Sequence, residues 1–254
     1  MKKEKDFYEK IGNWDFSDIN SVSETKEKWD MYEEVEKYAN EKSLILDLGT
    51  AGGEKVLNEM PKNVGMTIGT DLSPAMIKTA RKNALKYPEV KAKFTVMDNL
   101  KIEFPNELFD IVVARNTVIN AKEIHRILTN CGILIVRGVD KFDCWNLKEL
   151  FGRGQAYNDK KAISEIDYEN IKEAGFRDIK TVAIDVNEYY KTPDDLLKLL
   201  LKTPILDDFS EEGDSGFAHR EKVEKDLFDL YVKNNTYEKG ILLKRKYYGI
   251  VAEK

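Results

Sequence analysis

Carboxylates stand at the ends of two apolar runs in the first third of the chain, and glycines follow the first of them. Asp47 lies in the run 44–48, and Asp71 closes the segment 63–71. Three glycines follow Asp47 closely: Gly49, Gly52 and Gly53. A carboxylate only accepts hydrogen bonds, which suits amino and hydroxyl groups, and glycine lets a backbone come close to a ligand. These residues predict a cradle for a small polar ligand.

The residues around Asp47 predict the elements that hold this cradle. The run 44–48 is typical of a buried strand, and Val56 and Met60 continue after the glycines at helical spacing. The first N–H groups of a helix favour a negatively charged group. A dinucleotide fingerprint would need glycine where Ala51 and Glu54 stand, so a nicotinamide dinucleotide is disfavoured.

The turn resembles the first motif of class I S-adenosylmethionine-dependent methyltransferases, which runs Asp-x-Gly-x-Gly-x-Gly after the first strand. Asp47, Gly49 and Gly53 match this motif, whereas Ala51 replaces its middle glycine. The resemblance implies S-adenosylmethionine as cofactor and S-adenosylhomocysteine as product. It also implies that the turn residues Thr50 and Gly52 bind the cofactor. Taken alone, the stretch also fits the strand, turn and helix of any α/β protein.

The segment that ends in Asp71 is similar to the second motif of the same family. Ser73 is a good helix N-cap and Pro74 a good first helical residue, so a helix is expected to about Tyr87. The resemblance implies that Asp71 accepts hydrogen bonds from the ribose hydroxyls. Met76 belongs to the same motif and is assigned to the cofactor site with it.

The adenine end of the cofactor is assigned to residues beside two strand ends. Leu72 follows Asp71, and Met97, Asp98 and Asn99 follow the expected strand 91–97. The resemblance implies that Leu72 and Met97 pack on the ring and that Asp98 or Asn99 lies near its amino group. Alternatively, Asp98 only forms a turn.

The fourth strand, over 108–116, ends at the sheet edge where open α/β folds bind ligands. Ala114, Arg115 and Asn116 are therefore assigned to the cofactor, and Thr117 to the substrate. Arg115 could bind the methionine end of the cofactor or the acceptor, and the alternative is a structural ion pair.

The remaining strands are expected over 132–139, 179–186 and 241–251. The resemblance predicts an α/β fold: a Rossmann-like sheet of seven mostly parallel strands, with an antiparallel last strand and helices on both faces. About 50 residues separate the last two strands, far more than a hairpin needs. A helical insertion is therefore expected between strands six and seven.

The expected organisation is a helical N-terminal lid segment over 1–40, with a helix from about 23 to 40, and a methyltransferase domain over 41–254. The insertion is placed at about 190–238. Trp14, Tyr189 and Tyr190 are assigned to the acceptor pocket. The alternatives are that the N-terminal aromatic side chains pack on the outside of the core, that the tyrosines are ordinary strand residues, and that the leucines of the insertion form a packing or dimer face.

Composition limits the classes of partner. The chain carries 46 acidic and 41 basic residues, a net charge of −5, which does not suit bulk nucleic-acid binding. The two cysteines are too few for a disulfide framework, and no metal-ligand spacing occurs. The sequence contains no long apolar run typical of a membrane span, so a cytoplasmic protein is expected.

The function predicted from these patterns is methyl transfer from S-adenosylmethionine to a small molecule. The alternatives are an RNA or protein methyltransferase, and a non-catalytic protein that binds the cofactor. No catalytic residue is assigned, because methyl transfer depends mainly on positioning. His125 and His219 are weak candidates for a general base.

Overall fold

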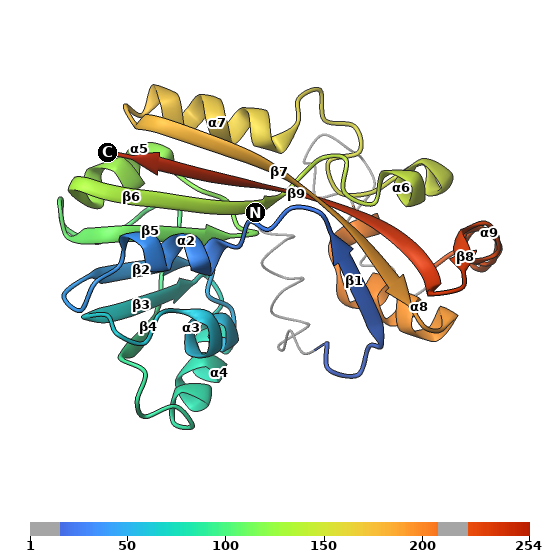
Figure 1. Ribbon diagram of the computed structural model, residues 1–254, viewed down its shortest axis with the longest axis horizontal. Helices are drawn as coiled ribbons and strands as arrows, with labels where there is room; N and C mark the ends of the chain where they lie inside the picture. Colours follow the sequence, from blue (N-terminus) through green and yellow to red (C-terminus); the bar gives the residue numbers. More distant parts are fainter. Residues whose placement is uncertain (1–15, 208–222) are drawn as a thin grey trace. The chain divides into compact units, whose positions relative to one another are not determined.

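Residues 16–207 and 223–254 are described by the computed structural model, which divides into two units (Figure 1). Unit 1 takes the described parts of Met1–Lys28, Asp140–Ala162 and Ile184–Tyr247. Unit 2 takes Trp29–Val139, Ile163–Ala183 and Tyr248–Lys254. Each unit is therefore built from three separate stretches of the chain.

The sheet of unit 2 contains the seven strands expected from the sequence. Their order is β7-β9-β6-β5-β2-β3-β4. The strands are β2 (Leu44–Leu48), β3 (Met66–Asp71), β4 (Ala92–Val96), β5 (Phe109–Arg115), β6 (Leu128–Val139), β7 (Arg177–Tyr190) and β9 (Gly240–Glu253). Strands β2 to β6 pair in parallel, whereas β9 runs opposite to β7 (Figure 1). The predicted Rossmann-like sheet is thus confirmed, and β7 and β9 also continue into unit 1.

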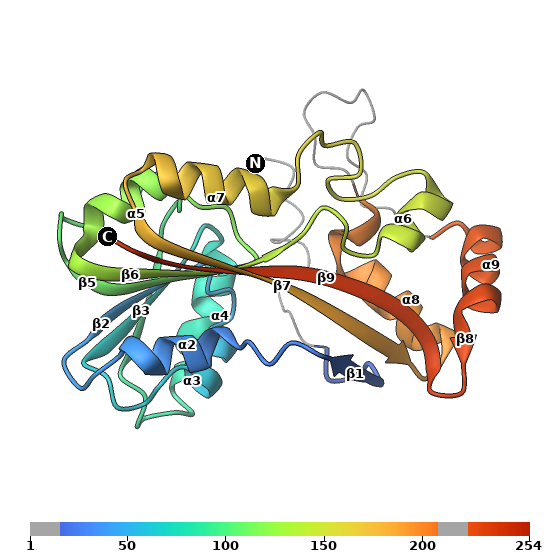
Figure 2. The same cartoon turned by 45° about the horizontal axis from the view of Figure 1, so that its top comes forward.

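Helices cover both faces of this sheet (Figure 2). They are α2 (Met31–Tyr38), α3 (Glu54–Glu59), α4 (Pro74–Ala84), α5 (Ala121–Ile127) and α7 (Ile163–Glu173). Helices α2, α3 and α4 share one apolar cluster with Ile45, Ile111 and Ile135. Helices α5 and α7 share the other with Leu46 and Val112. Because side chains alternate along a strand, the odd-numbered residues that follow Ile45 in β2, Ile111 in β5 and Ile133 in β6 face α2.

The N-terminal segment differs from the helix expected over 23–40. Its helix α2 begins only after Asp30, whose carboxylate accepts hydrogen bonds from the N–H groups of Tyr32 and Glu33. Residues Ser21–Thr25 instead form β1, which pairs antiparallel with the end of β7. The prediction of a helix from residue 23 was therefore wrong, because the true N-cap lies seven residues later.

Unit 1 contains the helices expected in the insertion. Its remaining elements are α6 (Trp145–Phe151), α8 (Pro193–Lys202), the short 3-10 helix η1 (Pro204–Leu206), α9 (Lys225–Asn235) and β8 (Thr236–Tyr237). Thr192 and Asp195 form a reciprocal capping box at the start of α8. Leu196, Leu199 and Leu200 are buried in the core of this unit, which favours the packing role for the leucine face.

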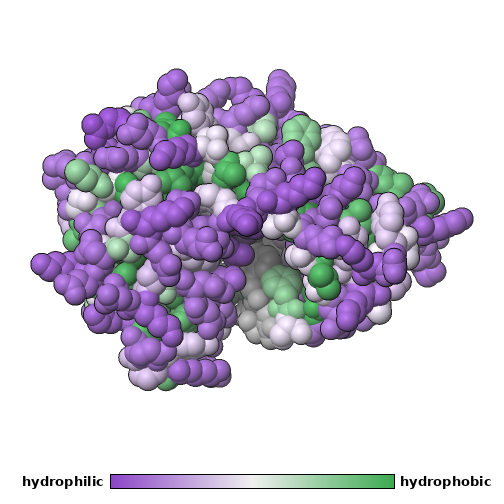
Figure 3. Space-filling model, viewed as in Figure 1, coloured by the Kyte–Doolittle hydropathy of each residue, from purple (hydrophilic) through white to green (hydrophobic). Residues whose placement is uncertain are grey.

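Hydrophilic side chains cover most of the face shown in Figure 3. Among residues 16–207 and 223–254, no helix combines the length and apolar character needed to cross a bilayer.

Candidate functional site

The turn after β2 depends on residues with a left-handed backbone. Gly49, Ala51 and Gly53 have φ angles of 72°, 49° and 77°. A Cβ on Gly53 would lie 2.9 Å from Phe94 Cζ, and one on Gly49 would lie 2.8 Å from Thr117 Cβ. Glycine is therefore required at both ends of the turn, both for its backbone conformation and for the close approach of Phe94 in β4 and of Thr117, which follows β5.

Asp71, at the end of β3, holds this turn through its carboxylate. Its Oδ2 accepts a hydrogen bond from the N–H of Ala51 at 3.0 Å, and its Oδ1 accepts one from the N–H of Ser73 at 2.9 Å. Burial raises the pKa of Asp71, and these two N–H groups oppose the shift. Each carboxylate oxygen retains a further lone pair, so the group can still accept hydrogen bonds from a ligand.

Asp47, in β2, is almost completely buried, with 4% of its surface exposed. Burial raises its pKa to about 7 and the nearby Asp71 adds to the shift, while Thr50 and Arg115 oppose it. A buried carboxylate is costly unless a positive group or hydrogen-bond donors lie beside it. Asp47 is thus placed to stabilise a cationic group of a ligand.

The ends of β3, β4 and β5 are connected by side-chain hydrogen bonds. Asn99 Nδ2 donates to Thr117 Oγ1 at 3.1 Å, and Thr70 Oγ1 donates to Asn99 Oδ1 at 3.5 Å. Asp98 Oδ1 accepts from the N–H of Leu100 at 2.9 Å, so this carboxylate does form a turn. The assigned residues Asn99 and Thr117 therefore lie together beside Gly49.

Two arginines lie side by side where β5 and β6 end. Arg115 and Arg137 are register partners in the parallel pair β5–β6. Both are odd-numbered and continue the face that holds Val113 and Ile135, which is also the face of Asp47. Arg137 donates from its guanidinium to Asn116 Oδ1 at 3.0 Å. A row of charges therefore crosses three strands: Asp47, Arg115 and Arg137.

Tyr32 and Arg137 belong to this site although the sequence interpretation did not assign them. Tyr32 lies on α2, is 9% exposed, and interacts electrostatically with Asp47 and Arg115. Burial raises the pKa of its hydroxyl well above the ordinary value, and Asp47 adds to this. A signal for Arg137 existed: it interrupts an apolar strand at the position that Arg115 occupies in the preceding one.

The assigned apolar residues fall into two groups. Leu72 is 39% exposed, and Val96, the register partner of Asp71, is 46% exposed. Exposed apolar side chains at neighbouring strand ends suit the face of a nucleobase. Met76, Met97 and Ala114 are buried, and Ala114 belongs to the cluster under α5 and α7. A contact of Ala114 with a ligand would therefore use its backbone.

The structure places the predicted acceptor residues in different units. Thr117 belongs to unit 2, whereas Tyr189 and Tyr190 belong to unit 1. Tyr190 is buried, and its hydroxyl donates to Glu188 Oε2 at 2.6 Å. Tyr189 lies under the ammonium of Lys239. Trp14 and His219 lie outside the described residues, and the acceptor role of the tyrosines stays a prediction.

His125 packs against the core of unit 2 and lies away from the candidate site. It lies on α5, and its ring packs edge-on against Phe176 with 5.1 Å between centroids. Burial lowers its pKa, and Lys254 adds to this. Because α5 covers the face opposite to Asp47, the imidazole does not belong to the row of charges.

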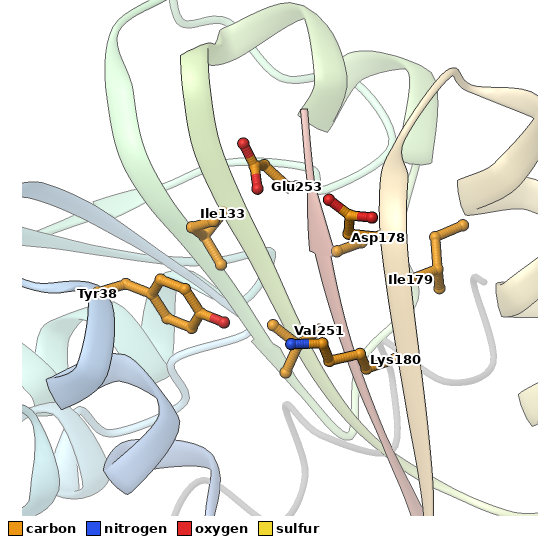
Figure 4. Close-up of a pocket in the computed structure, with 8 residues that line it drawn as sticks. Tyr38, Ile133, Asp178, Ile179, Lys180, Val251 and Glu253 are labelled. Carbon is orange, nitrogen blue, oxygen red and sulfur yellow. The ribbon is translucent and has the colours of Figure 1, made fainter.

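A separate cavity of about 490 Å³ lies in unit 2, toward the opposite ends of the strands (Figure 4). Tyr38, Ile133, Asp178, Ile179, Lys180, Val251, Ala252 and Glu253 line it. Ile133 is the register partner of Ile111, near the start of β5. The cavity therefore contains none of the residues assigned to the cofactor.

The residues present fit an S-adenosyl cofactor. The buried carboxylate of Asp47 suits the α-ammonium of a methionine end, and the neighbouring guanidinium of Arg115 suits its carboxylate. Asp71 has acceptor capacity for ribose hydroxyls, and Leu72 offers an exposed apolar surface nearby. Asp47 and Arg115 therefore match the methionine end of the cofactor, and Asp71 matches its ribose.

The family model of the methyltransferase domain matches residues 45–137, which run from β2 into β6. No curated protein matches the chain by sequence.

Solved structures share the fold at low sequence identity. The chain is similar to the YcgJ protein of Bacillus subtilis (15% identity, TM-score 0.57, 88% of this chain and 97% of that one). It is also similar to a functionally unknown protein from Deinococcus radiodurans (13% identity, TM-score 0.61, 99% of each chain).

A third similar structure is phosphoethanolamine N-methyltransferase 2 of Haemonchus contortus, in complex with phosphomonomethylethanolamine and S-adenosylhomocysteine. The identity is 18% and the TM-score 0.51, with 87% of this chain and 51% of that chain covered.

Proposed function

We propose that this chain transfers the methyl group of S-adenosylmethionine to a small-molecule acceptor, because residues 45–137 match the family model of a methyltransferase domain. The observation that carries this proposal is the placement of Asp47 beside Arg115 at adjoining strand ends. The methionine end of the cofactor is a zwitterion, so one charge of each sign at this edge suits it. Asp47 binds the ammonium, and Arg115 binds the carboxylate.

The rest of the cofactor follows the strand ends toward β4. Asp71 accepts hydrogen bonds from the ribose hydroxyls while the N–H groups of Ala51 and Ser73 hold its orientation. Leu72 and Val96 pack on the adenine. Asn99 lies near the adenine, and a hydrogen bond from the hydroxyl of Thr70 holds its side chain in place. The cofactor-binding role of each of these residues is part of the proposal.

The bound cofactor supplies an electrophilic methyl group on a sulfonium. The residues of this chain bind it, fix its orientation and keep water from the reacting centre, and such positioning can supply a large part of the acceleration. The hydrogen bonds from Asn99 to Thr117 and from the N–H of Ala51 to Asp71 hold these strand ends in position for this. We assign no general base.

The net charge of −5 supports a small acceptor rather than bulk nucleic acid. The similar fold of the Haemonchus contortus enzyme, whose structure contains a small phosphorylated amine, supports the same class of acceptor.

Two measurements on the full chain test the proposal. Calorimetry with S-adenosylhomocysteine is expected to show binding to the wild type, and Asp71→Ala is expected to weaken it at least about tenfold. Asp110→Ala is the matched control, because its carboxylate also accepts a backbone N–H, that of Leu44, but at the start of β2 and β5, away from the residues assigned to the cofactor. Failure of the wild type to bind would refute the proposal.

The second measurement incubates the protein and radiolabelled S-adenosylmethionine with a cell extract. Label is expected in the small-molecule fraction after size separation. Label confined to RNA or protein would contradict a small acceptor, and binding without any transfer would favour a non-catalytic role.

A further inference from the structure

The cavity of about 490 Å³ in unit 2 lies on the sheet face that α2 packs against, beside the last residue of that helix (Figure 4). Ile133 of β6 and Val251 of β9 belong to the apolar cluster of α2, and each is 7% exposed. These two residues form the floor of the cavity. Tyr38, which ends α2, lines the cavity with 39% of its surface exposed. The cavity therefore combines a buried apolar floor with an exposed rim.

Three charged side chains line this rim. Asp178 and Lys180 come from β7, and Glu253 comes from the neighbouring strand β9. Glu253 follows Val251 by two residues, so both side chains point to the same face of the sheet. Within the part of the chain that the structure describes, no side chain forms an ion pair with any of these three groups. Their charges are therefore available to a ligand.

The charges are separated by sign. In Figure 4 the carboxylates of Asp178 and Glu253 lie toward one end of the cavity, whereas the ammonium of Lys180 extends from β7 toward Tyr38. Like charges on neighbouring strands repel each other, and an ammonium between the two carboxylates would offset that repulsion. The ammonium of Lys180 and the hydroxyl of Tyr38 can both donate hydrogen bonds to an anionic group.

We propose that this cavity is a second small-molecule site, and that it binds a zwitterion whose ammonium and anionic group stand at opposite ends of an apolar chain. The ammonium lies between Asp178 and Glu253, the anionic group contacts Lys180 and Tyr38, and the chain packs on the floor. The volume is in the usual range for small-molecule pockets. None of the residues assigned to the cofactor lines the cavity, so the inference does not depend on the proposed function.

The probe is 6-aminohexanoate, titrated into isotope-labelled full-length protein and followed by the NMR shifts of backbone amides. It is expected to shift the amides of residues 178–180 and 251–253, with a dissociation constant of about 1 mM or lower for so small a ligand. Hexylamine and hexanoate keep the chain and one charge each. Each is expected to bind about threefold more weakly or worse, the value of one partly exposed ion pair.

Two variants connect each ligand charge to its partner. Lys180→Met and Glu253→Gln are each expected to weaken 6-aminohexanoate about threefold or more. Lys180→Met is expected to leave hexylamine unaffected, because hexylamine has no anionic group, and Glu253→Gln is expected to leave hexanoate unaffected. Lys93→Met is the matched control, since Lys93 is exposed on β4, at the other edge of this sheet.

Three results would overturn the inference. The first is that 6-aminohexanoate shifts none of the cavity amides, and the second is that hexylamine or hexanoate binds as tightly as 6-aminohexanoate does. The third is that folded Lys180→Met or Glu253→Gln binds 6-aminohexanoate as the wild type does. The comparison of the three ligands needs no variant, so it tests the inference even where a variant does not fold. S-adenosylhomocysteine, titrated separately, tests the proposed function, and its failure to bind would leave the result for this cavity unchanged.

Discussion

Asp71 Oδ2 accepts a hydrogen bond from the backbone N–H of Ala51 at 3.0 Å, which ties the end of β3 to the turn after β2. Asp71→Asn replaces one acceptor oxygen with a donor, so one of the two N–H groups loses its partner. The free energy of unfolding is expected to fall by about 1.5–3 kcal/mol, the range for hydrogen bonds to charged groups. Urea unfolding measures this, and a change no larger than in Asp98→Asn would contradict it.

Ala51 has a left-handed backbone conformation, with φ 49°. It occupies the position of the middle glycine in the methyltransferase motif Asp-x-Gly-x-Gly-x-Gly. Ala51→Gly is expected to raise the free energy of unfolding by about 0.5–1 kcal/mol, because glycine adopts this conformation without a steric cost. Thermal unfolding of the two proteins at one pH measures the change. Ala75→Gly in α4 is the opposite control, since glycine inside a helix destabilises it.

The carboxyl of Asp47 makes stability depend on pH. Its pKa of about 7 in the folded protein lies above the ordinary 3.8, so the folded state binds the proton more tightly than the unfolded chain. The stability from this group is fully present below pH 3.8 and is lost as the pH rises through about 7. The wild type without ligand is therefore expected to lose stability between about pH 4 and about pH 7.

Asp47→Asn removes this proton equilibrium, so its stability is expected to change less over the same range. Burial also raises the pKa values of Asp71 and Asp167, which leaves a residual slope of the same sign. Urea unfolding across the pH range measures both proteins. Equal slopes in the wild type and the variant would contradict the account of Asp47.

A buried ion cluster stabilises unit 1. Arg245 contacts both carboxylate oxygens of Asp143, at 2.9 and 3.2 Å, and Glu188 at 3.1 Å. Arg245→Met leaves Asp143 buried without this partner and is expected to cost about 3–5 kcal/mol. Adding Asp143→Asn is expected to recover part of the loss, as a double-mutant cycle would show. Lys202→Met, which removes the exposed ion pair with Asp18, is expected to cost under about 1 kcal/mol.

The two cysteines are expected to differ in reactivity. Cys131 is exposed, whereas Cys144 is buried, and burial with the nearby Asp143 raises the pKa of its thiol. Because the thiolate is the reacting form, iodoacetamide is expected to label Cys131 in the folded protein and Cys144 only after unfolding. Mass spectrometry of the labelled peptides measures this. If iodoacetamide labelled Cys144 in the folded Cys131→Ser variant, the buried environment of Cys144 would be contradicted.

Local sequence was sufficient to predict the strand ends that carry the site. An apolar run that ends in Asp71, followed by Ser73 and Pro74, encodes a strand, a cap and a helix within a dozen residues. The same holds for Thr192 before α8. These signals depend on backbone hydrogen bonding and proline geometry, which act over a few residues.

Long-range pairing could not be predicted in this way. Strand β1 contains Val22 and four polar residues, and it is a strand because it pairs with the end of β7, more than 150 residues away. Nothing in the sequence around Tyr32 distinguishes it from the other aromatic residues of the N-terminal segment, and only the packing of α2 on the sheet brings it to Asp47 and Arg115. Arg137 is recognised as part of the candidate site only because it is the register partner of Arg115. Strand pairing, helix packing and strand register form only in the folded sheet, so the sequence of either segment alone does not predict them.

Strand β9 lies between β6 and β7, although it follows both in the sequence. During synthesis on the ribosome, β7 emerges before the strand that must separate it from β6. The edge of β6 then stays open until residues 248–253 are made, and an open edge invites pairing with other chains. We therefore expect nascent chains that stop before β9 to depend on chaperones, whereas strands β2 to β6 can assemble early.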